Sequence, residues 1–166
     1  MESLYLHVPF CRHRCHYCDF YTLAGREDAM EAYVDRAVDE MRISSRRFAN
    51  PVSSIFFGGG TPTLLPPPLL GKLMEGVREH IPLEEDLEWT VEANPETVNV
   101  EAARVLAEHG ATRVSLGAQS FDPSLLANLE RRHEPDSVAR GVECLRNAGI
   151  RHCNIDLIYA KPGQSM

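Results

Sequence analysis

Short apolar runs, rich in β-branched and aromatic residues, alternate along the chain with longer segments in which apolar residues recur at helical spacing. The short runs are typical of strands, because a strand that is buried on both faces is apolar along its length. The predicted strands cover residues 4–8, 54–57, 87–92, 113–116 and 152–159. This alternation indicates an α/β chain.

Helices are predicted in the segments between these runs. They cover residues 30–41, 70–81, 99–110, 121–129 and 135–149, and the fourth of them is shorter than the others. Pro66 to Pro68 mark the start of the second helix, where proline is tolerated because the first helical residues need no partner for a backbone N–H. Asn99 is a typical N-cap for the third helix, and Gly110 and Gly149 are typical of helix ends.

Strands that alternate with helices predict βαβ units and a parallel sheet with helices covering its faces. Five strands and four main helices make an open, incomplete barrel, because a complete (β/α)₈ barrel needs about 250 residues. We therefore expect residues 1–166 to form the N-terminal part of a TIM-type barrel with parallel strands and outer helices. The sequence stops at Met166, directly after a strand and before any covering helix, so we expect the barrel to be truncated there.

Composition narrows the class of protein. With 43% hydrophobic and 25% charged residues, the chain is typical of a soluble globular domain. The formal net charge of -7 and the lack of a long Lys and Arg cluster argue against nucleic acid as a partner. The N-terminus has no basic segment and only a short apolar run, so it predicts neither a signal peptide nor a membrane span. We expect a cytoplasmic protein that is not integral to a membrane.

Five cysteines, three of them within eight positions, form a crowded and odd-numbered set. This spacing argues against a disulfide framework and favours metal ligation in a reducing compartment. Cys11, Cys15 and Cys18 follow the first predicted strand, at the end where ligand sites of parallel α/β folds lie. These three residues are the predicted metal ligands.

Two kinds of metal site remain open from the residues alone. A structural zinc site could use His13 or His16 as its fourth ligand, but such sites usually combine two separated ligand pairs, and no second CxxC or HxxxH pair follows. An iron–sulfur cluster also uses cysteine thiolates, and three of them would leave one iron open.

The pattern Cys-x₃-Cys-x₂-Cys is similar to the cluster motif of the radical S-adenosylmethionine (SAM) superfamily. The string from Tyr5 to Phe20 resembles the coproporphyrinogen dehydrogenase and HemW branch of that superfamily. Further segments agree in order, and they are Phe57-Gly-Gly-Gly-Thr-Pro-Thr-Leu-Leu65, Val91-Glu-Ala-Asn-Pro95, Ser115-Leu-Gly-Ala-Gln-Ser-Phe121 and Asp156-Leu-Ile-Tyr159 with Pro162-Gly-Gln164. The resemblance implies a [4Fe-4S] cluster on the three cysteines, with SAM on the open iron.

The resemblance also implies a set of SAM contacts, which are Tyr5, Tyr17, Gly59, Gly60, Thr61, Glu92, Gln119, Arg131 and Asp156. For two kinds of residue in this set, a ligand contact can also be argued from the residue type alone. Glycines let a ligand approach the backbone closely, and a carboxylate near the end of an apolar strand needs a polar partner. A plain tight turn also explains the glycines, and isolated polar residues are more often structural or surface groups. No catalytic residue is assigned.

The remaining cysteines and histidines receive no functional role. Cys144 lies at helical spacing with apolar neighbours and Cys153 begins a strand, so both are interpreted as packing residues. The histidines outside the cysteine segment are scattered along the chain, and a lone histidine is usually structural or exposed to solvent.

Phe20 distinguishes two members of the branch. Coproporphyrinogen dehydrogenases carry a further cysteine two positions after the third ligand, whereas this chain has Phe20 there, so it resembles the HemW-type haem chaperones more closely. The alternative is an oxygen-independent coproporphyrinogen III oxidase, an oxidoreductase of porphyrin biosynthesis, and the second alternative is a zinc-binding structural module. Ala160 and Lys161 also replace the Gly-Leu pair usual in the family, a change that could alter the loop after the last strand.

A haem chaperone of this kind implies haem or a porphyrinogen as cargo or substrate, a haem-acceptor protein, and a small electron donor such as a flavodoxin or ferredoxin. The His-Asn-x-x-Tyr-Trp motif that is associated with haem in the family does not occur in residues 1–166. We therefore expect the haem site to lie outside these residues, and haem binding rests on the family analogy alone.

Overall fold

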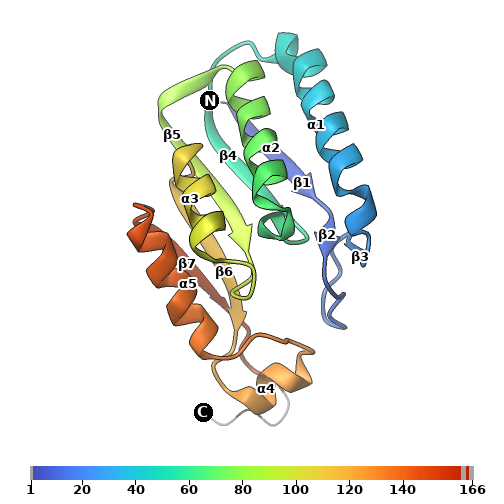
Figure 1. Ribbon diagram of the computed structural model, residues 1–166, viewed down its shortest axis with the longest axis vertical. Helices are drawn as coiled ribbons and strands as arrows, with labels where there is room; N and C mark the ends of the chain where they lie inside the picture. The colour runs from blue at the N-terminus through green and yellow to red at the C-terminus, as the bar shows by residue number, and fades with distance from the viewer. Residues whose placement is uncertain (1, 162–163, 165–166) are drawn as a thin grey trace.

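A computed structural model describes residues 2–161 and residue 164 of the chain (Figure 1). Within them, the strands are β1 (Glu2–Val8), β2 (Phe10–Cys11), β3 (Leu23–Ala24), β4 (Val52–Gly59), β5 (Leu83–Ala93), β6 (Arg113–Gln119) and β7 (His152–Leu157). The α-helices are α1 (Met30–Ser44), α2 (Pro67–His80), α3 (Val100–Glu108), α4 (Pro123–Asn128) and α5 (Asp136–Asn147). Short 3₁₀ turns are η1 (Glu27–Ala29), η2 (Ser45–Arg47) and η3 (Pro62–Leu64).

The main sheet has five strands in the order β1-β4-β5-β6-β7, and each strand runs parallel to its neighbours. Figure 1 shows α1, α2, α3 and α5 lined up along one face of this sheet in chain order. The loops that follow the five strands therefore meet at one edge, the carboxyl edge, where ligand sites of such folds are built. This arrangement confirms the predicted partial barrel with parallel strands and outer helices.

The core lies between the sheet and these helices. Trp89 of β5 is fully buried and packs edge-on against Phe57 of β4, with ring centroids 5.3 Å apart. Val34 of α1 and Leu73 of α2 are fully buried from the helix side, as their helical spacing predicts. Burying side chains of this kind contributes about 1.5–3 kcal/mol each, so the core holds the sheet and helices as one unit.

The opposite face of the sheet is polar near the carboxyl edge. Glu92, Ser115 and Asn154 lie side by side on β5, β6 and β7, and Asp156 follows two residues further along β7 on the same face. A barrel interior is usually filled by branched apolar side chains. Here the same positions carry hydrogen-bonding groups, so this face forms the floor of a polar site.

The predicted strands and helices are all present, and their ends differ from the predicted ones by a few residues. β5 begins earlier than predicted, at Leu83, because its first residues include an exposed acidic run that gives no apolar signal. The sequence pattern missed β2 and β3, which have two residues each and pair with one another, because so short a segment has no period. Pro162 and Gly163 of the resembling segment, and the end of the chain at Met166, lie outside the described residues.

Asn99 forms the predicted N-cap of α3, since its side-chain oxygen accepts a hydrogen bond from the backbone N–H of Ala102 at 2.9 Å. In the described part of the chain, no helix combines the length and the apolar character needed to cross a membrane.

Candidate functional site

The cysteine loop, residues 11–24, leaves the carboxyl edge after β1 and returns to it. Its base is closed by the β2–β3 pair, in which Phe10 lies opposite Leu23 and Cys11 opposite Ala24. Two further backbone hydrogen bonds hold the base, from Leu23 N to Pro9 O at 2.8 Å and from Gly25 N to Cys11 O at 3.3 Å. The loop is therefore anchored at both ends beside the ends of the other strands.

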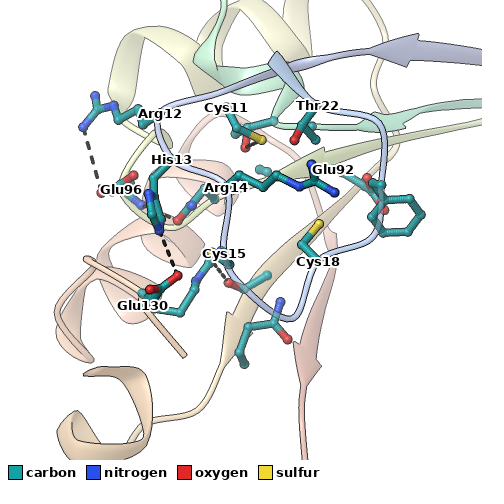
Figure 2. Close-up of a pocket in the computed structure, with 18 of the residues that line it drawn as sticks. Cys11, Arg12, His13, Arg14, Cys15, Cys18, Thr22, Glu92, Glu96 and Glu130 are labelled. Atoms are coloured by element: carbon teal, nitrogen blue, oxygen red, sulfur yellow. Dashed lines mark hydrogen bonds and ion pairs between the residues drawn. The ribbon is translucent and has the colours of Figure 1, made fainter. Parts of the chain in front are cut away.

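One pocket lies between this loop and the strand ends (Figure 2). It is lined by the three predicted metal ligands, Cys11, Cys15 and Cys18, and by most of the predicted SAM contacts, namely Tyr17, Gly59, Gly60, Thr61, Glu92, Gln119, Arg131 and Asp156. These residues come from six separate segments of the chain. The fold therefore brings residues that are far apart in the sequence into one pocket.

The three cysteines are free and partly buried. The Cys11 sulfur lies 3.8 Å from the Thr61 hydroxyl, and burial raises the pKa of the Cys11 thiol above its usual range. Among residues 2–161 and 164, no three His, Cys, Asp or Glu side chains are close enough together to hold a metal ion. The thiols therefore share one pocket without forming a closed set of ligands.

Glu92 joins β5 to the end of β4. Its carboxylate accepts a hydrogen bond from the backbone N–H of Gly59 at 3.1 Å, and burial raises its pKa above the usual range. A partly buried carboxylate with this single hydrogen bond has capacity for a further donor, such as an amino or hydroxyl group.

The glycines at the end of β4 and directly after it, residues 58–60, are required by contacts within the protein. A Cβ on Gly58 would lie 2.8 Å from a Glu92 oxygen, one on Gly59 would lie 2.5 Å from the His7 ring, and one on Gly60 would lie 2.5 Å from the Phe10 carbonyl oxygen. Gly59 also has a φ of 106°, which residues with a Cβ rarely adopt. Contacts with neighbouring protein atoms therefore give these glycines a structural reason, and their role in the approach of a ligand stays a prediction.

A hydrogen-bond network orients Asp156 on the pocket floor. Ser115 Oγ donates to one carboxylate oxygen at 2.8 Å, and the amide of Asn154 donates to the other at 2.7 Å and to Ser115 Oγ at 2.9 Å. Neither Ser115 nor Asn154 was predicted as a site residue. Their positions on one face of adjacent strands were the signal that could have found them.

Arg131 and Gln119 form another wall. Arg131 Nη2 donates to the Gly117 carbonyl oxygen, while Arg131 Nε is buried and has no hydrogen-bond partner within the described residues. Gln119 ends β6 with a φ of 66°, a conformation that non-glycine residues rarely adopt outside special sites. A partly buried guanidinium whose Nε–H lacks a partner in the described residues fits a carboxylate ligand.

Glu130 lies opposite the tip of the cysteine loop and was not predicted. Its carboxylate accepts hydrogen bonds from His13 Nε2 and from the backbone N–H of His16, each at 3.1 Å. These contacts, the bond from His13 first, lower the pKa of the Glu130 carboxyl below its usual range. No local pattern in the sequence marks this residue.

Basic side chains also line the pocket beyond the predicted set. Arg12 forms an ion pair with Glu96, with 3.9 Å between the nitrogen and oxygen atoms. Figure 2 shows the Arg14 side chain extending from the loop into the pocket, in the direction of Glu92. The pocket therefore mixes positive groups on the loop with carboxylates on the strand ends.

Tyr5 is the one predicted contact that does not line the pocket. Its ring stacks on Phe56 with centroids 6.2 Å apart, and its hydroxyl lies 3.0 Å from His7 Nδ1. His7 Nε2 in turn donates to the Tyr21 carbonyl oxygen at 2.9 Å, so Nδ1 accepts from Tyr5 in the neutral ring. Tyr5 thus supports the cysteine loop through His7.

Tyr17 of the cysteine loop contacts Lys161 in the loop that follows β7. Burial raises the pKa of Tyr17 to about 12, and Lys161 Nζ lies 5.6 Å from the centre of its ring. Ala160 has a φ of 60°, a conformation that favours glycine. The Ala160-Lys161 pair therefore gives this loop a strained turn and a cation–π contact with the cysteine loop.

Cys144 and Cys153 lie away from the pocket and pack against the hydrophobic core, where both are partly buried. This placement agrees with their interpretation as packing residues.

Comparison with known proteins shows similarity to one superfamily. The radical SAM superfamily model matches residues 5–166. The haem chaperone HemW of Lactococcus lactis is 39% identical over 165 residues, which are 99% of this chain and 43% of that protein. The oxygen-independent coproporphyrinogen III oxidase of Bradyrhizobium diazoefficiens is 37% identical over 167 residues, covering 99% of this chain and 37% of that protein.

A solved structure agrees with these relatives. The coproporphyrinogen III oxidase HemN of Escherichia coli, described as a radical SAM enzyme, aligns with a TM-score of 0.89 and 30% identity. The alignment covers 98% of this chain and 38% of that one. The chain therefore spans less than half the length of the relatives it matches.

Proposed function

Because the chain belongs to the radical SAM superfamily, we propose that it binds a [4Fe-4S] cluster through Cys11, Cys15 and Cys18 and acts as a HemW-like haem chaperone. The superfamily implies the cluster and SAM. The assignment of these three residues as ligands, and of haem as cargo, is our proposal. The observation that carries the cluster assignment is the shared pocket between the cysteine loop and the strand ends, and the similarity to HemW supports the chaperone role.

The residues of the pocket fit the two cofactors. Three thiols on one loop are the donor set of an iron–sulfur cluster with one open iron, and the Arg131 Nε that lacks a partner in the described residues suits the carboxylate of SAM. A bound cluster supplies an electron for cleavage of the SAM sulfonium, and the protein supplies binding and orientation.

Each wall of the pocket has a distinct task in this proposal. Glu92, fixed by the Gly59 N–H, accepts a hydrogen bond from the amino group of SAM. Asp156, held by Ser115 and Asn154, accepts from ribose hydroxyls. The lining is completed by Gly60, Thr61, Gln119 and Tyr17.

Residues 1–166 form the N-terminal part of the radical SAM core in this proposal. The polar inner face of the sheet and the coverage of 43% of HemW support that assignment. A haem-acceptor protein and a flavodoxin or ferredoxin as electron donor are the partners that the chaperone function requires. The cytoplasm is the compartment in which such reduced thiols persist.

Phe20 supports the chaperone over the oxidase. It lines the pocket and is 61% exposed, so a large apolar side chain stands where the oxidases of this branch carry a further cysteine. The oxidase remains the second candidate, because the Bradyrhizobium relative is 37% identical.

Single replacement of Cys11, Cys15 or Cys18 by Ala tests the cluster. Each variant should lose the oxygen-sensitive cluster, because a lost thiolate removes one of three ligands. Cys144→Ala and Cys153→Ala are matched controls that should retain it. Anaerobic reconstitution followed by iron and sulfide analysis measures the effect. Stoichiometric zinc without labile sulfide would instead support the structural zinc module.

Product analysis separates the chaperone from the oxidase. The reconstituted complete protein is incubated anaerobically with coproporphyrinogen III, SAM and a strong reductant, and its haem binding is measured by absorbance titration. We expect haem binding without decarboxylation. Formation of the divinyl product would establish the oxidase as the better assignment.

A further inference from the structure

Glu130 occupies a backbone position that ordinarily favours glycine. α4 ends in a Schellman motif, in which Arg131 N donates to Leu126 O at 2.9 Å and Glu130 N donates to Ala127 O at 3.0 Å. The residue at the centre of this motif is Glu130, with a left-handed φ of 55°. A non-glycine residue is held in this conformation when its surroundings over-determine it.

The side-chain contacts of Glu130 help to hold it in this left-handed conformation. One carboxylate oxygen accepts from His13 Nε2 and from the His16 backbone N–H, each at 3.1 Å, and lies 3.5 Å from His16 Nδ1. Figure 2 shows Glu130 below His13, with Cys15 beside it. An exposed ion pair contributes little by itself. The bond to the backbone N–H, however, fixes the path of the loop whatever the charge of the histidines.

The same turn also places a second pocket residue. Arg131 follows Glu130 directly and donates through Nη2 to the Gly117 carbonyl oxygen of β6. The turn therefore contacts the cysteine loop with one residue and the end of β6 with the next. His13 and His16 flank Cys15 in the sequence, so the contact on the loop spans that cysteine.

We propose that Glu130 is a positioning residue that fixes segment 13–16, and Cys15 within it, against the α4 side of the pocket. The inference rests on the proposed function, because it takes Cys15 as a cluster ligand. It predicts that the loop is partly ordered for cluster assembly before any iron binds.

Three variants test this role. Glu130→Gly removes the carboxylate while the new residue adopts the left-handed backbone freely, so the fold is retained. Glu130→Gln keeps an acceptor oxygen and should restore part of the effect. Glu134→Gln is the control, since it also removes one negative charge. Glu134 lies four residues after Glu130, is exposed, and its side chain makes no hydrogen bond in the described residues.

Hydrogen exchange of the cluster-free protein is the first measurement. Loss of one such hydrogen bond should speed exchange of the 12–18 segment by about fivefold in Glu130→Gly. Glu130→Gln should fall between Glu130→Gly and wild type, and Glu134→Gln should match wild type. Thermal melts accompany the measurement, and a melting temperature equal to or above that of wild type shows that the fold is intact. Unchanged exchange in a folded Glu130→Gly protein would overturn the proposal.

Loss of iron to a chelator from the reconstituted protein is the second measurement. It should be about fivefold faster in Glu130→Gly than in wild type. Equal rates in the two proteins would overturn the link to Cys15. A wild-type protein that takes up no iron and sulfide would contradict the proposed function, and hydrogen exchange would still decide whether Glu130 orders the loop.

Discussion

His133 is the one histidine in the described residues that is almost fully buried, with 5% of its surface exposed. Within the described part of the chain neither ring nitrogen has a hydrogen bond of good geometry, although the Ala118 backbone is a polar group that acts on the ring. Burial, and then the positive charge of Arg131, lower the pKa of His133 to about 4. The buried ring is therefore neutral at pH 7.

This residue gives a pH dependence of stability. The pKa of His133 is about 4 in the folded state and 6.5 for an unperturbed histidine, so the unfolded chain binds more protons between these values. The stabilising contribution is complete above pH 6.5 and is lost as the pH falls toward 4. Between pH 7 and pH 5, we expect it to decrease by about 2 kcal/mol.

Urea unfolding of the cluster-free protein at pH 7 and pH 5 measures this loss. His133→Gln should show a smaller decrease than wild type, because the titrating group is gone. Replacement of the exposed His152 by Gln is the control, and it should leave the decrease as in wild type. Equal decreases in wild type and His133→Gln would contradict the assignment.

At the scale of elements, α1 and α2 approach each other closely at one glycine. A Cβ on Gly76 of α2 would lie 2.7 Å from Val38 Cγ2 of α1, whereas the closest atom to a Cβ on Gly71 would be a His109 ring carbon at 3.4 Å. Valine has a stiff side chain that gives way at a cost. Two glycines on one helix therefore have different packing environments.

The pair Gly76→Ala and Gly71→Ala tests this difference. Alanine raises helix propensity by about 1 kcal/mol at either position. At position 71 we expect this gain to appear as a higher free energy of unfolding. At position 76, overpacking against Val38 costs about 1–3 kcal/mol and should cancel or reverse the gain. Chemical denaturation of both variants measures the free energy of unfolding. Equal changes in the two variants would show that α1 and α2 separate easily.

At the scale of the whole molecule, the sheet has an exposed side at β7. Within the described residues, β7 pairs only with β6, and Ile155 and Leu157 remain 38% and 56% exposed. A parallel edge strand with one open side and exposed apolar side chains is a template for pairing between molecules. The same strand, β7, also carries Asn154 and Asp156 of the polar floor.

Residues 1–166 expressed alone should therefore self-associate. Leu157→Lys should weaken the association severalfold, because a lysine on an edge strand opposes pairing. Ile43→Lys is the matched control, since Ile43 is 65% exposed on α1, away from this edge. Sedimentation over a range of concentrations measures the effect. A wild-type chain that stays monomeric throughout would show that the edge is inert.

The sequence by itself determined the order and type of the main-sheet strands and the α-helices, and it placed three cysteines on one loop. Apolar periodicity and cysteine spacing are local properties, so they can be read from neighbouring residues. The N-cap at Asn99 and the parallel sheet followed from such signals. About half of the residues that line the pocket were predicted, because they lie in short local segments that resemble the family.

Only the tertiary structure decided which side chains support the site. Glu130 and His13 are 117 positions apart, and Ser115 and Asp156 are 41 apart, so no local pattern connects them. The need for Gly59 likewise depends on the ring of His7 on another strand. Tyr5 lies outside the pocket because its ring stacks on Phe56 of the neighbouring strand. These contacts arise from the register of parallel strands and from the packing of loops at the carboxyl edge, which the chain fixes only when it folds.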